Sequence, residues 1–182
     1  EPRHPAPAFV LQALAAETDS YMRYPPIAGL PVWREAVAGW LHRRFGIAAD
    51  SLAEATQILP LNGTREGLFL AAQLAPPKAD GLMAMPNPFY QVYASAVTAA
   101  GATPVYLDAS EATGFLPDLE ALDEATLESL RALYLCSPAN PPGTIADLDY
   151  LQKAYDLAKR YGFILLVDEC YAEIYDRAYE AT

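Results

Sequence analysis

From about residue 54 onward, the hydrophobic positions fall into short apolar runs that alternate with longer stretches of helical spacing. The short runs predict β-strands at Thr56–Leu61, Leu82–Met85, Pro104–Leu107, Ala132–Cys136 and Phe163–Val167. Several of these runs are apolar at successive positions, as expected for strands that helices cover on both faces of a sheet.

The stretches between the strands predict helices at Thr64–Leu74, Phe89–Ala100, Asp118–Leu130 and Leu148–Tyr161. The last of them has the clearest pattern, because apolar side chains recur at spacings of three and four, Asp147 can cap its start and Gly162 can end it. Alternating strands and helices are typical of βαβ units. The sequence therefore predicts an α/β fold, with three α/β/α layers around a mostly parallel sheet.

A different pattern precedes the sheet region. Pro31–Arg44 carries apolar side chains at helical spacing and follows the proline-rich, aromatic stretch Tyr21–Pro26. We therefore expect residues 1–45 to form an N-terminal arm with a first helix, and residues 46–182 to form the sheet domain. Such an arm docks either on the chain's own domain or on a second subunit.

The two ends of the chain predict a partial sequence. It begins at Glu1 without an initiator Met, and it stops at Thr182 just after an apolar strand. Both observations are typical of an excerpt from a longer polypeptide.

Length and composition indicate one stable core. The 182 residues are 53% hydrophobic and 19% charged, and a chain of this length corresponds to about one domain. The formal net charge of −11 repels phosphate backbones and anionic lipids, so nucleic acids and membranes are poor partners. Since no apolar stretch approaches the roughly 20 residues that span a bilayer and no signal region opens the chain, we expect a cytoplasmic protein.

Ligands of open α/β sheets bind beyond the carboxyl ends of the strands, so the residues after each strand carry the candidate chemistry. After the first predicted strand, Asn62-Gly63-Thr64-Arg65-Glu66 leads directly into a helix. It offers an anion backbone N–H groups, a hydroxyl and the positive end of the helix dipole. This turn is a candidate phosphate cup, although an ordinary βα loop is built in the same way.

Three further loops carry candidate groups. Phe89 and Tyr90 follow the second strand, where an aromatic ring stacks on a flat ligand or packs in the core. Asn140 lies in a proline-rich loop that holds its amide in a fixed direction. Asp168 ends the last apolar strand and, once buried, requires a cationic or hydrogen-bonding partner.

The sequence lacks the motifs of other classes of ligand-binding site. The chain has no Gly-x-x-x-x-Gly-Lys-Ser/Thr loop of a P-loop ATPase, and no Gly-x-Gly-x-x-Gly follows a strand. His4 and His42 lie on the arm and the first helix, which leaves little for a histidine-centred hydrolase or a zinc site. Cys136 and Cys170 show neither metal-ligand spacing nor a disulfide framework, so we expect reduced, buried thiols and no metal site.

Taken in order, the cup, the aromatic residue, the Asn in a proline-rich loop and the Asp-x-x-Tyr strand end resemble a known family. It is the class I/II, fold-type I, pyridoxal-phosphate-dependent aminotransferases, whose large domain these motifs match. Tyr24–Val37 is similar to the family's Tyr-x-x-x-x-Gly-x-x-x-Leu-Arg motif, with Trp33 where Leu is commoner. Glu1–Phe9 and Pro86–Tyr93 are most similar to the bacterial succinyldiaminopimelate aminotransferases. The resemblance covers essentially the whole chain.

The resemblance implies pyridoxal 5′-phosphate as the cofactor and a homodimer with shared active sites. Gly63, Thr64 and Arg65 would cradle the cofactor phosphate. Tyr24, on the arm, would reach the cofactor phosphate of the other subunit.

The same resemblance assigns four residues to the cofactor ring. Tyr90 would stack on it, and Asn140 and Tyr171 would form hydrogen bonds with its phenolic oxygen. Asp168 would keep the pyridine nitrogen protonated, so that the ring accepts electrons. Pro142 stands where the family usually has Thr, which leaves the neighbouring Asn140 in place.

The family's Schiff-base lysine, which binds the cofactor and shuttles a proton, has no match in this chain. Lys78, Lys153 and Lys159 all precede Asp168, and we expect them to be solvated surface residues. The lysine, the arginine that grips the substrate α-carboxylate, a C-terminal small domain and two more strands of the sheet are expected after Thr182. The chain alone is therefore expected to be inactive.

For the complete protein, the resemblance implies a transaminase of the diaminopimelate and lysine biosynthetic pathway. It would transfer an amino group from glutamate to N-succinyl-2-amino-6-oxopimelate, with amino acids and keto acids as its substrates. Another class I/II aminotransferase or a carbon–sulfur lyase on the same fold is the alternative among enzymes. A catalytically inactive fragment or a noncatalytic binding module is the alternative outside them.

Overall fold

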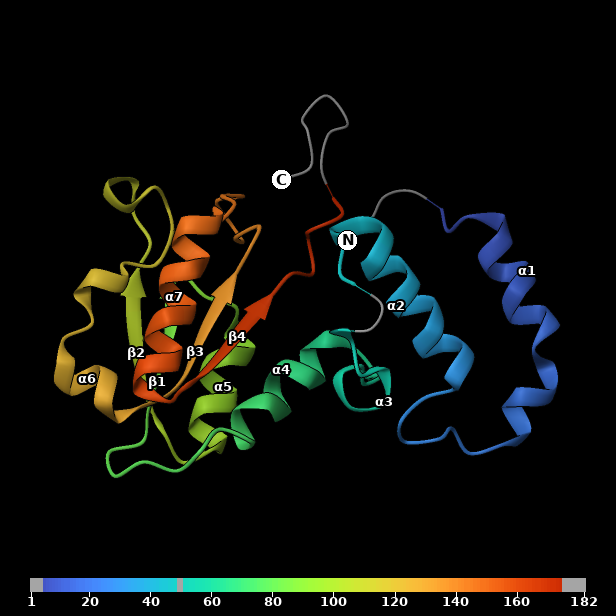
Figure 1. The fold of residues 1–182 in the computed structure, drawn as a ribbon, viewed down its shortest axis with the longest axis horizontal. Helices are drawn as coiled ribbons and strands as arrows, with labels where there is room; N and C mark the ends of the chain where they lie inside the picture. Colours follow the sequence, from blue (N-terminus) through green and yellow to red (C-terminus); the bar gives the residue numbers. More distant parts are fainter. Residues whose placement is uncertain (1–4, 49–50, 175–182) are drawn as a thin grey trace. The chain divides into compact units, whose positions relative to one another are not determined.

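The structure is a computed structural model that describes residues 5–48 and 51–174. The chain divides into two compact units, Glu1–Pro60 and Leu61–Thr182 (Figure 1). The assignment of residues 46–60 to the sheet domain stays a prediction. Among the described residues, no helix is long and apolar enough to cross a membrane.

The N-terminal unit consists of short helices. They are α1 (Ala8–Ala16), a 3₁₀ helix (Thr18–Met22), α2 (Pro31–Phe45) and α3 (Glu54–Gln57). The predicted first helix is confirmed as α2, which has Pro31 at its first position and ends at Gly46 in the left-handed conformation. Within the predicted arm, Ala8–Ala16 also forms a helix, α1, because this stretch is rich in helix formers and contains neither Gly nor Pro.

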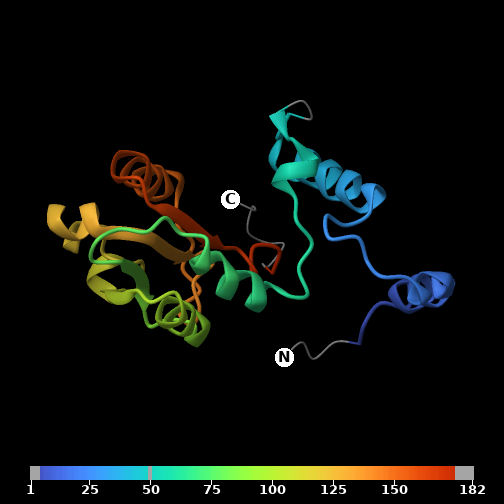
Figure 2. The same ribbon diagram turned by 90° about the horizontal axis from the view of Figure 1, so that it is seen from below.

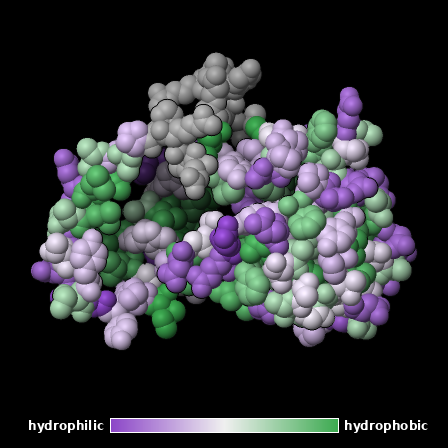
Figure 3. Space-filling model, turned by 180° about the vertical axis from the view of Figure 1, so that it is seen from behind, coloured by the Kyte–Doolittle hydropathy of each residue, from purple (hydrophilic) through white to green (hydrophobic). Residues whose placement is uncertain are grey.

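Many apolar side chains of this unit are exposed in the described chain. Phe9 is 69% exposed, Leu11 61% and Ile27 93%, and apolar (green) atoms lie among polar ones on the left of Figure 3. Helix α1 has no buried residue.

A turn held by Arg34 precedes α2. One guanidinium nitrogen of Arg34 donates to the carbonyls of Ala28 and Gly29, at 2.6 and 2.8 Å. The turn joins the tyrosine-bearing arm to the helix.

The predicted strand at Thr56–Leu61 is wrong. The backbone N–H groups of Thr56 and Gln57 both donate to the carbonyl of Ala53 in a helical turn, at 2.9 Å each. Residues 58–61 then form no strand, since Pro60 has no N–H to donate to a ladder. The apolar pattern of Thr56–Leu61 predicts a β-strand, but the hydrogen bonds to the Ala53 carbonyl give this segment a helical start instead.

The C-terminal unit contains a four-stranded parallel sheet in the order β2-β1-β3-β4. The strands are β1 (Leu82–Asn87), β2 (Thr103–Asp108), β3 (Leu130–Cys136) and β4 (Ile164–Asp168). The register between β3 and β4 pairs Cys136 with Asp168 at their carboxyl ends. The predicted α/β fold with a parallel sheet is confirmed.

Helices cover both faces of the sheet, as Figure 2 shows from below. Helices α4 (Thr64–Gln73) and α5 (Gln91–Ala99) pack on one face, and α6 (Glu124–Ser129) and α7 (Leu148–Tyr161) pack on the other. Side chains alternate along each strand, so Met83 faces the α4/α5 layer while its neighbour Ala84 faces the α6/α7 layer. This alternation explains why the strand sequences are apolar throughout.

Three of the predicted helices have different bounds, and the one predicted at Thr64–Leu74 ends at Gln73. Asp118–Leu130 is not one helix, because Asp118 and Asp123 each accept a backbone N–H and start separate short helices, and Leu130 already belongs to β3. The helix predicted from Phe89 begins at Gln91. By contrast, α7 has the predicted bounds, with Asp147 accepting from the N–H of Tyr150 at 2.8 Å.

Candidate functional site

A pocket of about 330 Å³ lies at the carboxyl ends of β1, β3 and β4, beside the first turn of α4. Strand order reverses at β1, since the chain passes first to β2 on one side and then to β3 on the other. Connections that leave in opposite directions open a crevice at this point of a parallel sheet, where ligands of such folds bind. The volume lies within the range of small-molecule sites, about 300–1,000 Å³.

Gly63 shapes the turn in front of α4. Its φ of 141° and ψ of 149° belong to a region that is essentially restricted to glycine. A Cβ atom at this position would meet nothing within 4 Å, so backbone conformation rather than space requires glycine. The helix starts at Thr64 without a side-chain cap, and its first turn therefore has backbone N–H groups without an intrahelical partner, the feature that anion sites at helix N-termini use.

Arg65 and Tyr90 connect the turn to the loop after β1. The Nε atom of Arg65 donates a hydrogen bond to the Tyr90 hydroxyl, and its guanidinium carbon lies 5.6 Å from the centre of the Tyr90 ring. The Tyr90 ring meets Tyr93 edge to face, with centroids 5.8 Å apart. Tyr90 therefore lines the pocket and also packs against the edge of the core under α4 and α5.

Asp168 is the buried acid of the site, with 8% of its surface exposed. Its Oδ2 atom accepts a hydrogen bond from the Tyr93 hydroxyl at 2.8 Å, and its Oδ1 atom accepts one from the backbone N–H of Cys170 at 3.2 Å. The buried carboxylate is expected to need a cationic or hydrogen-bonding partner. It has two neutral ones, the Tyr93 hydroxyl and the Cys170 N–H.

Asn140 and Tyr171 meet across the loops that follow β3 and β4. The Nδ2 atom of Asn140 donates to the Tyr171 hydroxyl at 3.1 Å. The loop of Asn140 is closed by two backbone hydrogen bonds of 2.7 Å, between Ala139 and Thr144 and between Gly143 and Ala139. The two residues that the resemblance assigns to one ligand atom are therefore neighbours.

The structure brings most of the predicted site residues together. The following line the same pocket: Thr64, Arg65, Tyr90, Asn140, Asp168 and Tyr171. Gly63 directly precedes them in the turn. Tyr24 belongs to the N-terminal unit, where its side chain is fully exposed.

The sequence analysis missed Tyr93, Cys136 and Cys170, which also line the pocket. Helical spacing places Tyr93 one turn after Tyr90. No sequence pattern near Tyr93 indicates its contact with Asp168, which lies 75 positions away. Both thiols are free, and Cys170 is exposed, so the expectation that both are buried is wrong. Partial burial, reinforced by the negative charge of Asp168, raises the pKa of Cys170 to about 11 and also raises the pKa of Cys136.

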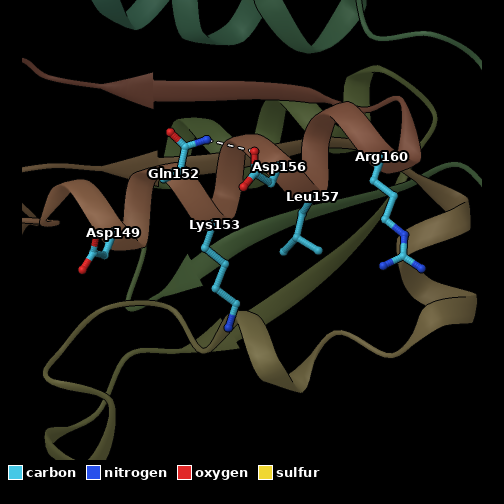
Figure 4. A pocket seen from close by; sticks show the side chains of 6 residues that line it. All are labelled: Asp149, Gln152, Lys153, Asp156, Leu157 and Arg160. Atoms are coloured by element: carbon cyan, nitrogen blue, oxygen red, sulfur yellow. Dashed lines mark hydrogen bonds between the residues drawn. The ribbon is translucent and has the colours of Figure 1, made fainter.

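A shallower depression of about 360 Å³ runs along α7 (Figure 4). All of its lining residues lie on that helix, including Gln152 and Asp156, which share a hydrogen bond of 2.9 Å. Lys153, also in its lining, forms an ion pair with Glu120. No strand end contributes, so this surface is not the candidate site.

Lys78, which the sequence predicts to be a solvated surface residue, is half-buried. Its Nζ atom donates to the carbonyl of Tyr161 at 2.6 Å, and burial lowers the pKa of this lysine. Lys153 pairs with Glu120, and Lys159 lies 5.9 Å from the Tyr155 ring centre. All three are therefore engaged outside the pocket.

The fold and the pocket define an α/β ligand-binding unit with its site at the switch point of a parallel sheet. Residues 1–181 match the family described as aminotransferase class I and II, and the chain belongs to this family. The aminotransferases of this family use pyridoxal phosphate.

The individual proteins that the chain is similar to are also aminotransferases. The chain is 37% identical over 176 residues to the LL-diaminopimelate aminotransferase of Dehalococcoides mccartyi, which corresponds to 96% of this chain and 44% of that protein. The crystal structure of an aminotransferase from Neisseria meningitidis matches with a TM-score of 0.89 and 37% identity, over 100% of this chain and 46% of that one. A probable N-succinyldiaminopimelate aminotransferase from Thermus thermophilus matches with a TM-score of 0.82 and 30% identity, over 94% and 45%. The chain therefore spans about half the length of the relatives it matches.

Proposed function

We propose that this chain carries most of the pyridoxal-phosphate half-site of an aminotransferase. The observation that carries the proposal is the buried Asp168 carboxylate, which faces a pocket that also holds an anion-binding turn and an aromatic wall. Each oxygen of this carboxylate already accepts one hydrogen bond from a neutral donor, and its remaining lone pairs can accept a charged donor such as a protonated pyridine nitrogen.

The residues of the pocket fit this cofactor in chemistry and position. Gly63, Thr64 and Arg65 provide N–H groups, a hydroxyl and a positive charge for the phosphate. Tyr90 offers the face of its ring for stacking. When bound, pyridoxal phosphate supplies an electron sink that stabilises the negative charge left at the substrate α-carbon.

The protein's own groups then have distinct tasks. Asp168 holds a proton at the pyridine nitrogen, which keeps the ring electron-poor. Asn140 and Tyr171 form hydrogen bonds with the phenolic oxygen, and their mutual contact of 3.1 Å keeps both at one place. Asp168 is itself buried, and the side chains around it would exclude water that weakens a charge pair at its carboxylate.

The complete protein, in this proposal, is a cytoplasmic homodimer in which Tyr24 reaches the cofactor phosphate of the other subunit. Glutamate is the proposed amino donor, and N-succinyl-2-amino-6-oxopimelate is the proposed acceptor. A second candidate acceptor is the keto acid that corresponds to LL-diaminopimelate, because a 37% identical relative is an LL-diaminopimelate aminotransferase. A panel of keto acids, including both candidate acceptors, separates these substrates from each other and from those of a carbon–sulfur lyase.

A cofactor titration tests the proposal. The protein as encoded by its gene is purified, its intact mass is recorded, and pyridoxal phosphate binding is followed by absorbance. We expect Asp168→Asn to weaken binding at least about tenfold, because a buried charge pair is lost. Asp156→Asn, a surface carboxylate on α7, is the matched control and should bind normally. Equal affinities for the two variants would contradict the proposed role of Asp168.

A further inference from the structure

The buried tyrosine behind Asp168 has no role in the function proposed above. We propose that Tyr93 is a positioning residue, whose hydroxyl holds the Asp168 carboxylate in its ionised form and in one orientation, so that the shared proton stays on the pyridine nitrogen of the cofactor. The inference rests on the proposed function, since it concerns how Asp168 acts on the same cofactor.

The contact itself is direct and enclosed. The Tyr93 hydroxyl lies 2.8 Å from the Oδ2 atom of Asp168, and only 1% of Tyr93 is exposed. The two residues come from α5 and from the end of β4, 75 positions apart in the sequence. The hydrogen bond is therefore largely shielded from solvent.

The Tyr93 ring is held on both sides. It stacks on Tyr134, with centroids 4.6 Å apart and planes inclined by 16°, and it meets Tyr90 edge to face. Tyr134 is anchored in turn, because its hydroxyl donates to the carbonyl of Leu68 at 2.8 Å. A ring held in this way has little freedom to withdraw its hydroxyl from Asp168.

The hydroxyl acts as a permanent donor. Burial, and then the contact with Asp168, raise the pKa of Tyr93 above its ordinary value, so the phenol stays protonated at physiological pH. The other carboxylate oxygen accepts the backbone N–H of Cys170. Hydrogen bonds that are donated to a carboxylate stabilise its charged form.

The location of one proton follows from this arrangement. In a carboxylate–pyridinium pair the proton is shared between nitrogen and oxygen, and the weaker base holds it less. The Tyr93 hydroxyl and the Cys170 N–H each donate to one oxygen of Asp168, so the carboxylate meets the cofactor as an acceptor and the proton remains on nitrogen. Without the hydroxyl, Oδ2 loses its donor and the proton moves from nitrogen towards oxygen, with no change in the total number of protons.

The chain offers a matched pair of variants. Tyr93→Phe and Tyr134→Phe each remove one hydroxyl from the same buried stack, but only the first removes a donor to Asp168. Both are prepared in the protein as encoded, and each is loaded with pyridoxal phosphate labelled with ¹⁵N in the ring. The ¹⁵N chemical shift reports the protonation of the nitrogen, and a separate titration gives the cofactor Kd.

The expected result is specific to one variant. Tyr93→Phe should move the ring ¹⁵N signal towards the unprotonated value and raise the Kd about fivefold, whereas Tyr134→Phe should keep the wild-type signal. Identical signals for wild type and Tyr93→Phe, or equal shifts in both variants, overturn the inference while the proposed function stands. A wild-type protein that does not bind pyridoxal phosphate overturns both.

If the Tyr93→Phe protein does not fold, a second replacement at position 93 tests the inference. Site-specific 3-fluorotyrosine at position 93 keeps the ring and has a more acidic, stronger-donating hydroxyl. The nitrogen signal should then stay at or move towards its protonated value. Movement towards the unprotonated value would overturn the inference.

Discussion

Arg65 and Tyr90, 25 positions apart in the sequence, form a hydrogen bond between the first turn of α4 and the residue that precedes α5. The same guanidinium lies against the Tyr90 ring. The turn proposed to bind the phosphate and the aromatic wall of the pocket are therefore connected by the Arg65 side chain. Its guanidinium stays charged while its Nε atom donates to Tyr90.

This connection predicts an energetic coupling between the two residues. Arg65→Lys keeps the charge but removes the Nε donor, and Tyr90→Phe keeps the ring but removes the acceptor. Since Arg65 is exposed, we expect a coupling free energy of only about 0.5–1 kcal/mol in a double-mutant cycle of urea unfolding. Strictly additive effects would show that the contact does not stabilise the protein.

Gly63, directly before the pocket residues, should be more sensitive to substitution than a glycine in the ordinary left-handed region. Replacing it with alanine forces a side chain into a backbone region that costs about 1–3 kcal/mol, and it should weaken cofactor binding through the displaced turn. Gly114→Ala is the matched control, because Gly114 has a φ of 62° in the ordinary left-handed region and also has open space around its Cβ position. Urea unfolding should show a larger loss of stability for Gly63→Ala, and equal losses would refute the conformational argument.

Cys170 should react slowly with alkylating reagents although it is exposed. With a pKa of about 11, its thiolate fraction at pH 7 is small, and the alkylation rate should rise about tenfold per pH unit up to that value. Because the negative charge of Asp168 contributes to the raised pKa, Asp168→Asn should lower the pKa and speed the reaction at pH 8. Peptide mass spectrometry after iodoacetamide treatment measures both rates, and unfolded protein provides the reference for an ordinary thiol.

Arg131 should be important for stability at the opposite end of the sheet. Its guanidinium donates to the carbonyls of Ala75, Pro76 and Ala100, at 3.0, 3.0 and 3.2 Å. These carbonyls follow α4 and α5, so one cation holds the ends of both helices.

Arg131→Met keeps the apolar stem of the side chain but removes all three hydrogen bonds, and we expect a loss of about 2–4 kcal/mol in the free energy of unfolding. Arg160→Met, on the exposed surface of α7, should change stability by less than about 0.5 kcal/mol. Urea unfolding followed by circular dichroism compares the two variants. A similar loss in both would mean that the contacts of Arg131 contribute little.

Local signals account for the parts of the fold that were predicted correctly. Helix α7 combines an apolar face, an Asp cap and a terminal Gly, and all three lie within or beside the helix itself. The predictions at Thr56–Leu61 and Asp118–Leu130 are wrong because Pro60 and the capping residues Asp118 and Asp123 outweigh the hydrophobic pattern there. Those residues are visible in the sequence, but their effect depends on which hydrogen bonds the backbone forms.

The candidate site shows a different limit of sequence reasoning. The family motifs point to Asp168 and its neighbours one by one, and the predicted set gathers in one pocket. Tyr93 carries no motif, since it lies inside an ordinary apolar helix pattern. Its contact with Asp168 depends on the order of the strands and on their register, which no local pattern contains.

The parallel sheet has a consequence for the time course of folding. All of its strand pairs are joined by crossover connections rather than hairpins, so each pairing closes a long loop, and sheets of this kind fold slowly. The pocket draws on residues from Thr64 to Tyr171 and cannot form on the ribosome until nearly the whole unit has emerged. A cofactor that needs this pocket will therefore select fully assembled molecules and, by mass action, protect them from unfolding.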